Sequence, residues 1–132
     1  MKIQDNFYLI VILFFSTNCT NYNDMTEHEI KNYLDNKYGN NVNYKTEEDG
    51  HISKVKFVDI PSLTEIPEEI RIFKGLEEIK ILNCNVTEVP EFITEFPELK
   101  ALWLEGNPIK EIPSFITKCH KLNILDISST EV

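Results

Sequence analysis

The sequence predicts an α/β solenoid, in which one short unit is stacked several times and its strands lie side by side in a parallel sheet. Three prolines, Pro67, Pro90 and Pro113, recur at a spacing of 23 residues. A fixed period of about 20 to 30 residues indicates one structural unit repeated along the chain. Aliphatic residues keep the same spacing in five further sets: Ile66, Val89 and Ile112; Ile70, Ile93 and Ile116; Leu76, Leu99 and Leu122; Ile79, Leu102 and Leu125; and Ile81, Leu104 and Ile127.

Length and composition indicate one folded domain. The chain has 132 residues, of which 42% are hydrophobic and 27% are charged, as is typical of a globular protein. Its formal net charge of −9 argues against a nucleic-acid partner, whose binding sites need clustered Lys and Arg. The same negative charge argues against binding to an anionic membrane by electrostatic attraction alone.

The N-terminal segment differs from the rest of the chain, because Phe7 to Phe15 is apolar without interruption and Lys2 precedes it. This run is shorter than the roughly 20 residues that a membrane-spanning helix needs, and it predicts a signal peptide over residues 1–18. Cys19, just after the run, resembles the cysteine of a bacterial lipobox, which becomes the acylated first residue of the mature chain. Asn18 departs from the small residue that lipoboxes prefer. An ordinary cleaved signal, an uncleaved anchor and a buried hydrophobic segment remain alternatives.

Residues 19–51 predict a tether followed by an N-terminal cap. Thr26 and Glu29 fit a capping box that starts a helix over about 27–38, and Gly39 is a plausible stop. This helix would bury Ile30, Tyr33, Leu34 and Tyr38.

A strand that includes Val42 and Tyr44 follows, since these residues alternate with polar ones. Asp49-Gly50 predicts a tight turn into the next strand. The helix and hairpin would cover the first repeat, as the ends of repeat arrays require.

Two complete units lie between residues 76 and 119. Both resemble the leucine-rich repeat pattern LxxLxLxxNxIxxIPxxIxxLxx, and the resemblance covers about residues 52–132, or three and a half units. In the first unit, Pro67 lies one residue further from the strand than the equivalent prolines of the later units, which predicts a small bulge at Ile60 and Pro61. The last unit contains Leu122, Leu125 and Ile127, and the sequence predicts no convex half and no C-terminal cap after it. The units read Leu76-x-x-Ile79-x-Ile81-x-x-Cys84-x-Val86-x-x-Val89-Pro90-x-x-Ile93-x-x-Phe96 and Leu99-x-x-Leu102-x-Leu104-x-x-Asn107-x-Ile109-x-x-Ile112-Pro113-x-x-Ile116-x-x-Cys119.

The resemblance implies a concave parallel sheet and a convex side of short helical turns. It also implies that Asn107 bonds to the backbone of neighbouring turns, a role for which Cys84 and Thr130 are weaker replacements and Ile60 is unsuited. The prolines suit the first turn of short helical or 3₁₀ segments. Four acidic residues beside these turns are expected to face water: Glu68, Glu69, Glu91 and Glu111.

A partner-binding patch is predicted on the concave side, because side chains alternate across a strand. The alternation turns Trp103, the single tryptophan, away from the core, and tryptophan is enriched among interface hot spots. The alternative is that Trp103 packs on Leu82 and Lys80 and merely covers the sheet. The predicted patch consists of Val58, Lys56, Leu82, Lys80, Trp103, Glu105 and Asp126.

The sequence offers no catalytic or metal-binding motif. Cys84 and Cys119 fall at repeat positions that predict small buried residues, and the three histidines are scattered. No G-x-S-x-G, Walker loop, H-E-x-x-H or CxxC occurs. We therefore expect no enzyme, no cofactor and no metal.

The sequence is consistent with two functions. The first is a lipid-anchored or secreted module of the bacterial cell envelope, periplasmic or surface-exposed, that binds a protein partner on its concave sheet; leucine-rich repeat proteins commonly bind proteins, so this prediction rests partly on the resemblance. The second is an assembly protein that forms a weak homodimer through an open sheet edge at residues 122–132.

Overall fold

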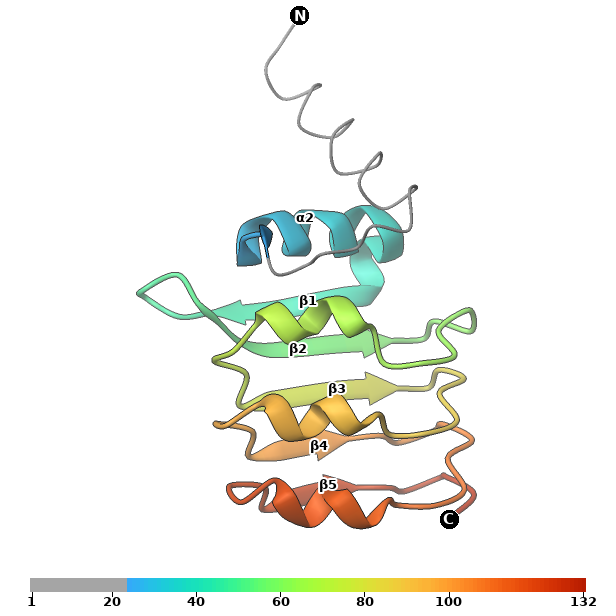
Figure 1. The fold of residues 1–132 in the computed structure, drawn as a ribbon. Helices are drawn as coiled ribbons and strands as arrows, with labels where there is room; N and C mark the ends of the chain where they lie inside the picture. The colour runs from blue at the N-terminus through green and yellow to red at the C-terminus, as the bar shows by residue number, and fades with distance from the viewer. Residues whose placement is uncertain (1–23) are drawn as a thin grey trace, which may run out of the picture.

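The computed structural model describes residues 24–132, which form one α-helix, a five-stranded sheet and a series of 3₁₀ turns (Figure 1). The predicted signal segment over residues 1–18 and Cys19 lie outside the described residues. In the described part of the chain, no helix has the length and apolar character needed to cross a membrane.

The helix α2 spans Glu27–Tyr38, as the sequence predicts. The capping box is present: the Thr26 side chain accepts a hydrogen bond from the Glu29 backbone N–H at 3.2 Å, and the Glu29 carboxylate accepts one from the Thr26 N–H at 2.7 Å. Together these bonds satisfy two N–H groups that a helix start leaves unpaired. The helix ends at Gly39, and its inward face buries Ile30 and Leu34 completely.

A short 3₁₀ turn, η2 (Gly39–Asn41), leads from the helix into the hairpin of β1 (Val42–Thr46) and β2 (Ile52–Val58). The two strands pair antiparallel, and Gly50 in the connecting turn has a φ of 92°, a conformation that glycine adopts without strain. Figure 1 shows α2 beyond β1 at one end of the sheet. The predicted helix-and-hairpin cap is confirmed.

Parallel pairing of β2 with three further strands forms the solenoid. These strands are β3 (Glu78–Leu82), β4 (Ala101–Trp103) and β5 (Ile124–Asp126), and the sheet order is β1-β2-β3-β4-β5. Val55 pairs with Ile79, Ile79 with Leu102, and Leu102 with Leu125. The step between the last three is the 23-residue period of the sequence, and the first step is one residue longer, as the predicted bulge requires.

Each coil turns away from the sheet at one repeat position, where φ is positive. The four residues at this position have φ values of 54°, 52°, 72° and 53°: Asp59, Asn83, Gly106 and Ser129. Asp, Asn and Gly tolerate this left-handed conformation better than other residues. Backbone bonds continue between coils here, since the Asn83 N–H donates to the Glu105 carbonyl at 2.9 Å and the Gly106 N–H donates to the Ser128 carbonyl at 3.1 Å.

Asn107 joins two coils through its buried side chain, which is 1% exposed. Its amide nitrogen donates to the carbonyls of Ile81 at 2.7 Å and Leu104 at 2.9 Å, and its Oδ1 accepts from the Val86 N–H at 3.2 Å. At the equivalent positions, the Cys84 thiol donates to the Leu82 carbonyl at 3.3 Å and the Thr130 hydroxyl donates to the Ile127 carbonyl at 2.7 Å, each within its own coil. The backbone of Ile60, in the preceding coil, also bonds to Cys84. Neither residue makes the full set of bonds that Asn107 makes, as expected for weaker hydrogen-bonding side chains.

The convex side consists of three 3₁₀ turns, η3 (Glu68–Ile72), η4 (Glu91–Glu95) and η5 (Ser114–Lys118), each following one of the repeated prolines. Glu68, Glu91 and Glu111 are exposed, as expected. The expectation for Glu69 is wrong, because this residue is only 7% exposed. Helix α2 packs against η3, so Glu69 lies under the cap beside Lys37 and Tyr38.

The core is a stack of aliphatic side chains that runs through the coils. Ile79 and Ile81 of β3, Leu102 of β4 and Leu104, which directly follows β4, are all 0% exposed. Leu125 occupies the same register in β5 and is 36% exposed. No further strand of the described residues pairs with the outer edge of β5.

Asn107→Ala is expected to lower the free energy of unfolding by about 2 to 3 kcal/mol, because it leaves buried backbone groups of two coils unpaired. Urea denaturation followed by circular dichroism measures the change. Asn85→Ala is the matched control, since the Asn85 amide donates to the Pro61 carbonyl at an exposed site and should cost less than about 1 kcal/mol. Equal losses for the two variants would contradict the role assigned to Asn107.

Candidate functional site

The outward side chains of the parallel strands form rows across the sheet. In the central row, Lys56 pairs in register with Lys80, Lys80 with Trp103, and Trp103 with Asp126. Val58 and Leu82 are register partners in the next row, and exposed Glu105 follows the end of β4. The register therefore places six of the seven residues of the predicted patch on one side of the sheet, and Glu105 lies just beyond the end of β4. We call this surface the sheet face: Lys56, Val58, Lys80, Leu82, Trp103, Glu105 and Asp126.

Trp103 lies on the sheet face and outside the aliphatic core. It is partly exposed, whereas its neighbours Leu102 and Leu104 are completely buried. The Lys80 ammonium lies 4.9 Å from the centroid of the indole ring, a distance at which a cation is attracted to an aromatic face. The indole Nε1 is covered and has no hydrogen-bond partner among the described residues, so packing and the Lys80 contact hold the ring.

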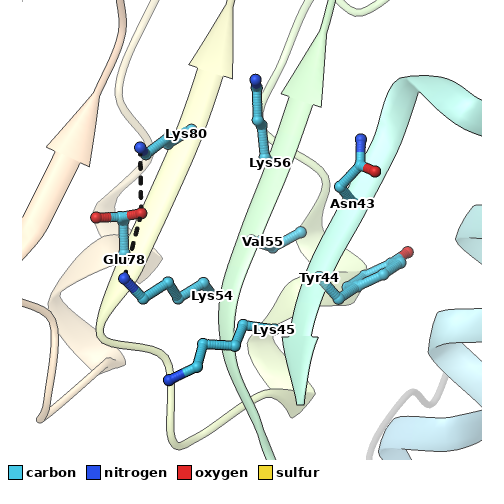
Figure 2. Close-up of a pocket in the computed structure, with 8 residues that line it drawn as sticks. All are labelled: Asn43, Tyr44, Lys45, Lys54, Val55, Lys56, Glu78 and Lys80. Carbon is cyan, nitrogen blue, oxygen red and sulfur yellow. Dashed lines mark ion pairs between the residues drawn. The ribbon is translucent and has the colours of Figure 1, made fainter.

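Lysines are concentrated beside Trp103, over β1, β2 and β3. Lys45, Lys54, Lys56 and Lys80 line a shallow depression of about 190 Å³ together with Glu78, and Figure 2 shows these side chains coming from three neighbouring strands. Sequence reasoning included Lys56 and Lys80 in the patch. It missed Lys45, because the register that brings Lys45 opposite Lys54 depends on the antiparallel pairing of β1.

Only part of this positive charge is neutralised locally. The Glu78 carboxylate lies 3.3 Å from the Lys80 ammonium and 3.8 Å from that of Lys54, and both contacts are drawn in Figure 2. Lys45 pairs with Glu47 at 2.8 Å. Lys56 makes no ion pair within residues 24–132. Among the described residues, the ion pairs of these four ammonium groups therefore involve two carboxylates, Glu78 and Glu47.

The opposite end of the sheet face is acidic. Asp126 ends β5, and exposed Glu105 follows β4. Hydrogen bonds from Ser128 to the Asp126 carboxylate hold the pKa of Asp126 below its usual value, which keeps this group ionised at neutral pH. The sheet face is thus basic at Lys56 and Lys80 and acidic at Glu105 and Asp126, with Trp103 between the two ends. Lys45 and Lys54 extend the basic end over β1 and β2.

The two described cysteines are core residues. Cys84 and Cys119 are 5% and 9% exposed and are not joined in a disulfide. Burial raises the pKa of both thiols, which opposes formation of the reactive thiolate. Within residues 24–132, no group of three or more His, Cys, Asp and Glu side chains is arranged to hold a metal ion.

Three solved structures are similar to this chain, and one of them, with a TM-score of 0.50, supports the fold assignment. The BIR3–SERK2 complex from Arabidopsis thaliana aligns with a TM-score of 0.50 and 23% identity over 69% of this chain and 50% of that chain. A Leptospira interrogans LRR protein aligns with a TM-score of 0.48 and 28% identity over 52% of this chain and 17% of that chain. The PEPR1–AtPEP1 structure aligns with a TM-score of 0.49 and 17% identity over 66% of this chain and 12% of that chain.

The chain thus spans half or less of the length of each of these structures. No protein-family model matches the sequence, and no curated protein matches it. The parallel ladder, the 23-residue period and the likeness to the Arabidopsis structure together define the class of fold. It is a short leucine-rich repeat solenoid with an N-terminal helix-and-hairpin cap.

Proposed function

We propose that this protein is a non-catalytic interaction module that binds a protein partner on the sheet face. The observation that carries the proposal is the position of Trp103, a large aromatic side chain kept out of the core and partly exposed between Lys80 and Asp126. Leu82 and Val58 add apolar surface in the next row. Aromatic anchors with apolar neighbours and a charged rim are the usual composition of a protein interface.

The fold is compatible with this use, because the connections between successive parallel strands all run on the same side of the sheet and leave the other side uncovered. In Figure 1, the 3₁₀ turns lie on one side of the strands. The Arabidopsis structure that shares the fold is itself a complex, of BIR3 with SERK2. That likeness supports a protein partner in general and does not identify one for this chain.

Trp103→Ala is expected to weaken partner binding by about 2 kcal/mol or more, because a central aromatic anchor is removed. Wild-type and variant proteins are immobilised and used to capture partners from cell extract, and each captured protein is then titrated by surface plasmon resonance. Phe92→Ala is the matched control: Phe92 is a partly buried aromatic on η4 that contacts the Arg71 guanidinium.

Loss of affinity in Trp103→Ala with retention in Phe92→Ala supports the sheet face as the docking surface. The proposal fails if the captured proteins bind Trp103→Ala as tightly as wild type.

Self-association through β5 is a second candidate function. Ile124 and Leu125 are 43% and 36% exposed on a strand whose outer edge is unpaired among the described residues, and open strand edges promote pairing with other chains. The same Trp103→Ala variant separates the two candidates. Under the second candidate, its sedimentation should remain as concentration-dependent as that of wild type, whereas a strictly monomeric wild-type protein at high concentration would remove this candidate.

The proposal includes a location outside the cytoplasmic membrane of a bacterial cell, with the chain anchored by a lipid on Cys19. Its support is the apolar run Phe7–Phe15 followed by Cys19. No described residue bears on this anchor.

Cells that express the protein should incorporate radioactive palmitate into it, and Cys19→Ala should abolish the labelling because the acylated thiol is removed. Cys84→Ala serves as the control, since Cys84 is buried in the core. Equal labelling of the wild type and Cys19→Ala would refute the anchor.

A further inference from the structure

We infer that the partner segment seated on the sheet face is an acidic peptide, whose carboxylates lie over Lys54, Lys56 and Lys80 and whose apolar end lies against Trp103. This inference rests on the proposed function and adds the chemistry of the partner. It begins from the lysine cluster of β1–β3, defined as Lys45, Lys54, Lys56 and Lys80.

The cluster is unusual for this protein, because the chain as a whole is strongly acidic. The sequence has 22 Asp and Glu against 13 Lys and Arg, and four of those basic residues gather on this one surface. Other basic side chains are paired between coils: Arg71 with Glu95 at 2.8 Å, Lys100 with Glu77 at 3.0 Å and Lys121 with Glu98 at 2.6 Å. Lys56 lacks such a pair in the described part of the chain and is available to a ligand.

Glu78 argues for a peptide over a compact anion. Its carboxylate lies between Lys54 and Lys80, so a phosphate group seated at the centre of the cluster would meet a like charge. A peptide distributes its negative charge along a chain, and side chains on one side of an extended peptide recur at about 6 to 7 Å. Such a segment can place one carboxylate on either side of Glu78.

The acidic end of the sheet face sets the direction of the peptide. Asp126 and Glu105 repel carboxylates from the part of the face over β4 and β5, and the lysines attract them to β1–β3. Between the two ends, the exposed part of Trp103 and its neighbour Leu82 offer apolar contact. The chemistry of the occupant therefore changes along its length, from acidic over β1–β3 to apolar at Trp103.

Trp103 provides the readout, because it is the single tryptophan of the chain. The probe is a synthetic peptide of six glutamates followed by two leucines, blocked at both ends, and its binding is followed by the change in indole fluorescence. Peptides with six lysines or six glutamines in place of the glutamates are the controls. An ionic strength of about 0.1 M is suitable, since the Debye length of about 10 Å confines the peptide's electrostatic contacts to the nearby lysines and screens the acidic remainder of the protein.

We expect the glutamate peptide to bind more tightly than either control peptide. Lys56→Gln removes one partly exposed charge and should weaken this binding about threefold. Lys56→Glu reverses the charge and should weaken it about tenfold. Lys118→Glu is the matched control: it changes the net charge equally, lies on the convex turn η5 and should leave the affinity unchanged.

Three results would overturn the inference. The first is equal or tighter binding of the lysine or glutamine peptide, and the second is equal weakening by Lys56→Glu and Lys118→Glu. The third is displacement of the glutamate peptide by inorganic phosphate or by phosphatidylglycerol vesicles at the same concentration of charge. If Trp103→Ala still binds its captured partner more weakly than wild type, each of these results contradicts the acidic-peptide inference and leaves the proposed function supported. Failure of the inference can therefore be distinguished from failure of the proposed function.

Discussion

The stacking of aliphatic side chains at a constant period is the constraint on which this structure depends. A single coil presents one row of aliphatic residues and cannot bury them alone, so each coil needs a neighbour of the same shape. The 23-residue step brings Ile79 beside Leu102 and Ile81 in line with Leu104, and all four are fully buried. The pairing of the outward residues across the sheet is set by the stacking of the inward ones. Lys56, Lys80 and Trp103 share a row because Phe57, Ile81 and Leu104 belong to one stack.

This dependence explains which features the sequence could predict. The repeat determines which strand residues point inward, so the core and the row Lys56-Lys80-Trp103-Asp126 follow from spacing, whereas the parallel pairing of the strands was implied by the leucine-rich repeat resemblance. The helix cap followed from a local signal, the Thr26–Glu29 capping box. Features that depend on how the cap packs on the first coil could not be predicted, because no periodicity relates the two. The burial of Glu69 under α2 is one such case, and the position of Lys45 opposite Lys54 is another.

The same arrangement separates stability from binding. Residues that join the coils are inward or at the turns, as Asn107 illustrates with its bonds to Ile81 and Val86. Residues of the sheet face contribute few such bonds, so their identities are free to serve recognition. Lysines gather on the outward side of the sheet in an acidic protein. Lys54 and Lys80 make exposed contacts between coils, with Glu78 and Trp103, whereas Lys56 makes no ion pair among the described residues and is free to serve recognition.

Removal of one whole coil tests the stacking account most directly. Deletion of residues 78–100 removes one 23-residue period and joins Glu77 to Ala101, which keeps the inward pattern in phase; deletion of residues 78–97 removes 20 residues and shifts it. The account predicts that the in-phase deletion retains a cooperative unfolding transition, at lower stability than the full chain, and that the out-of-phase deletion has none. Indistinguishable unfolding of the two proteins, whether both cooperative or both not, would contradict it.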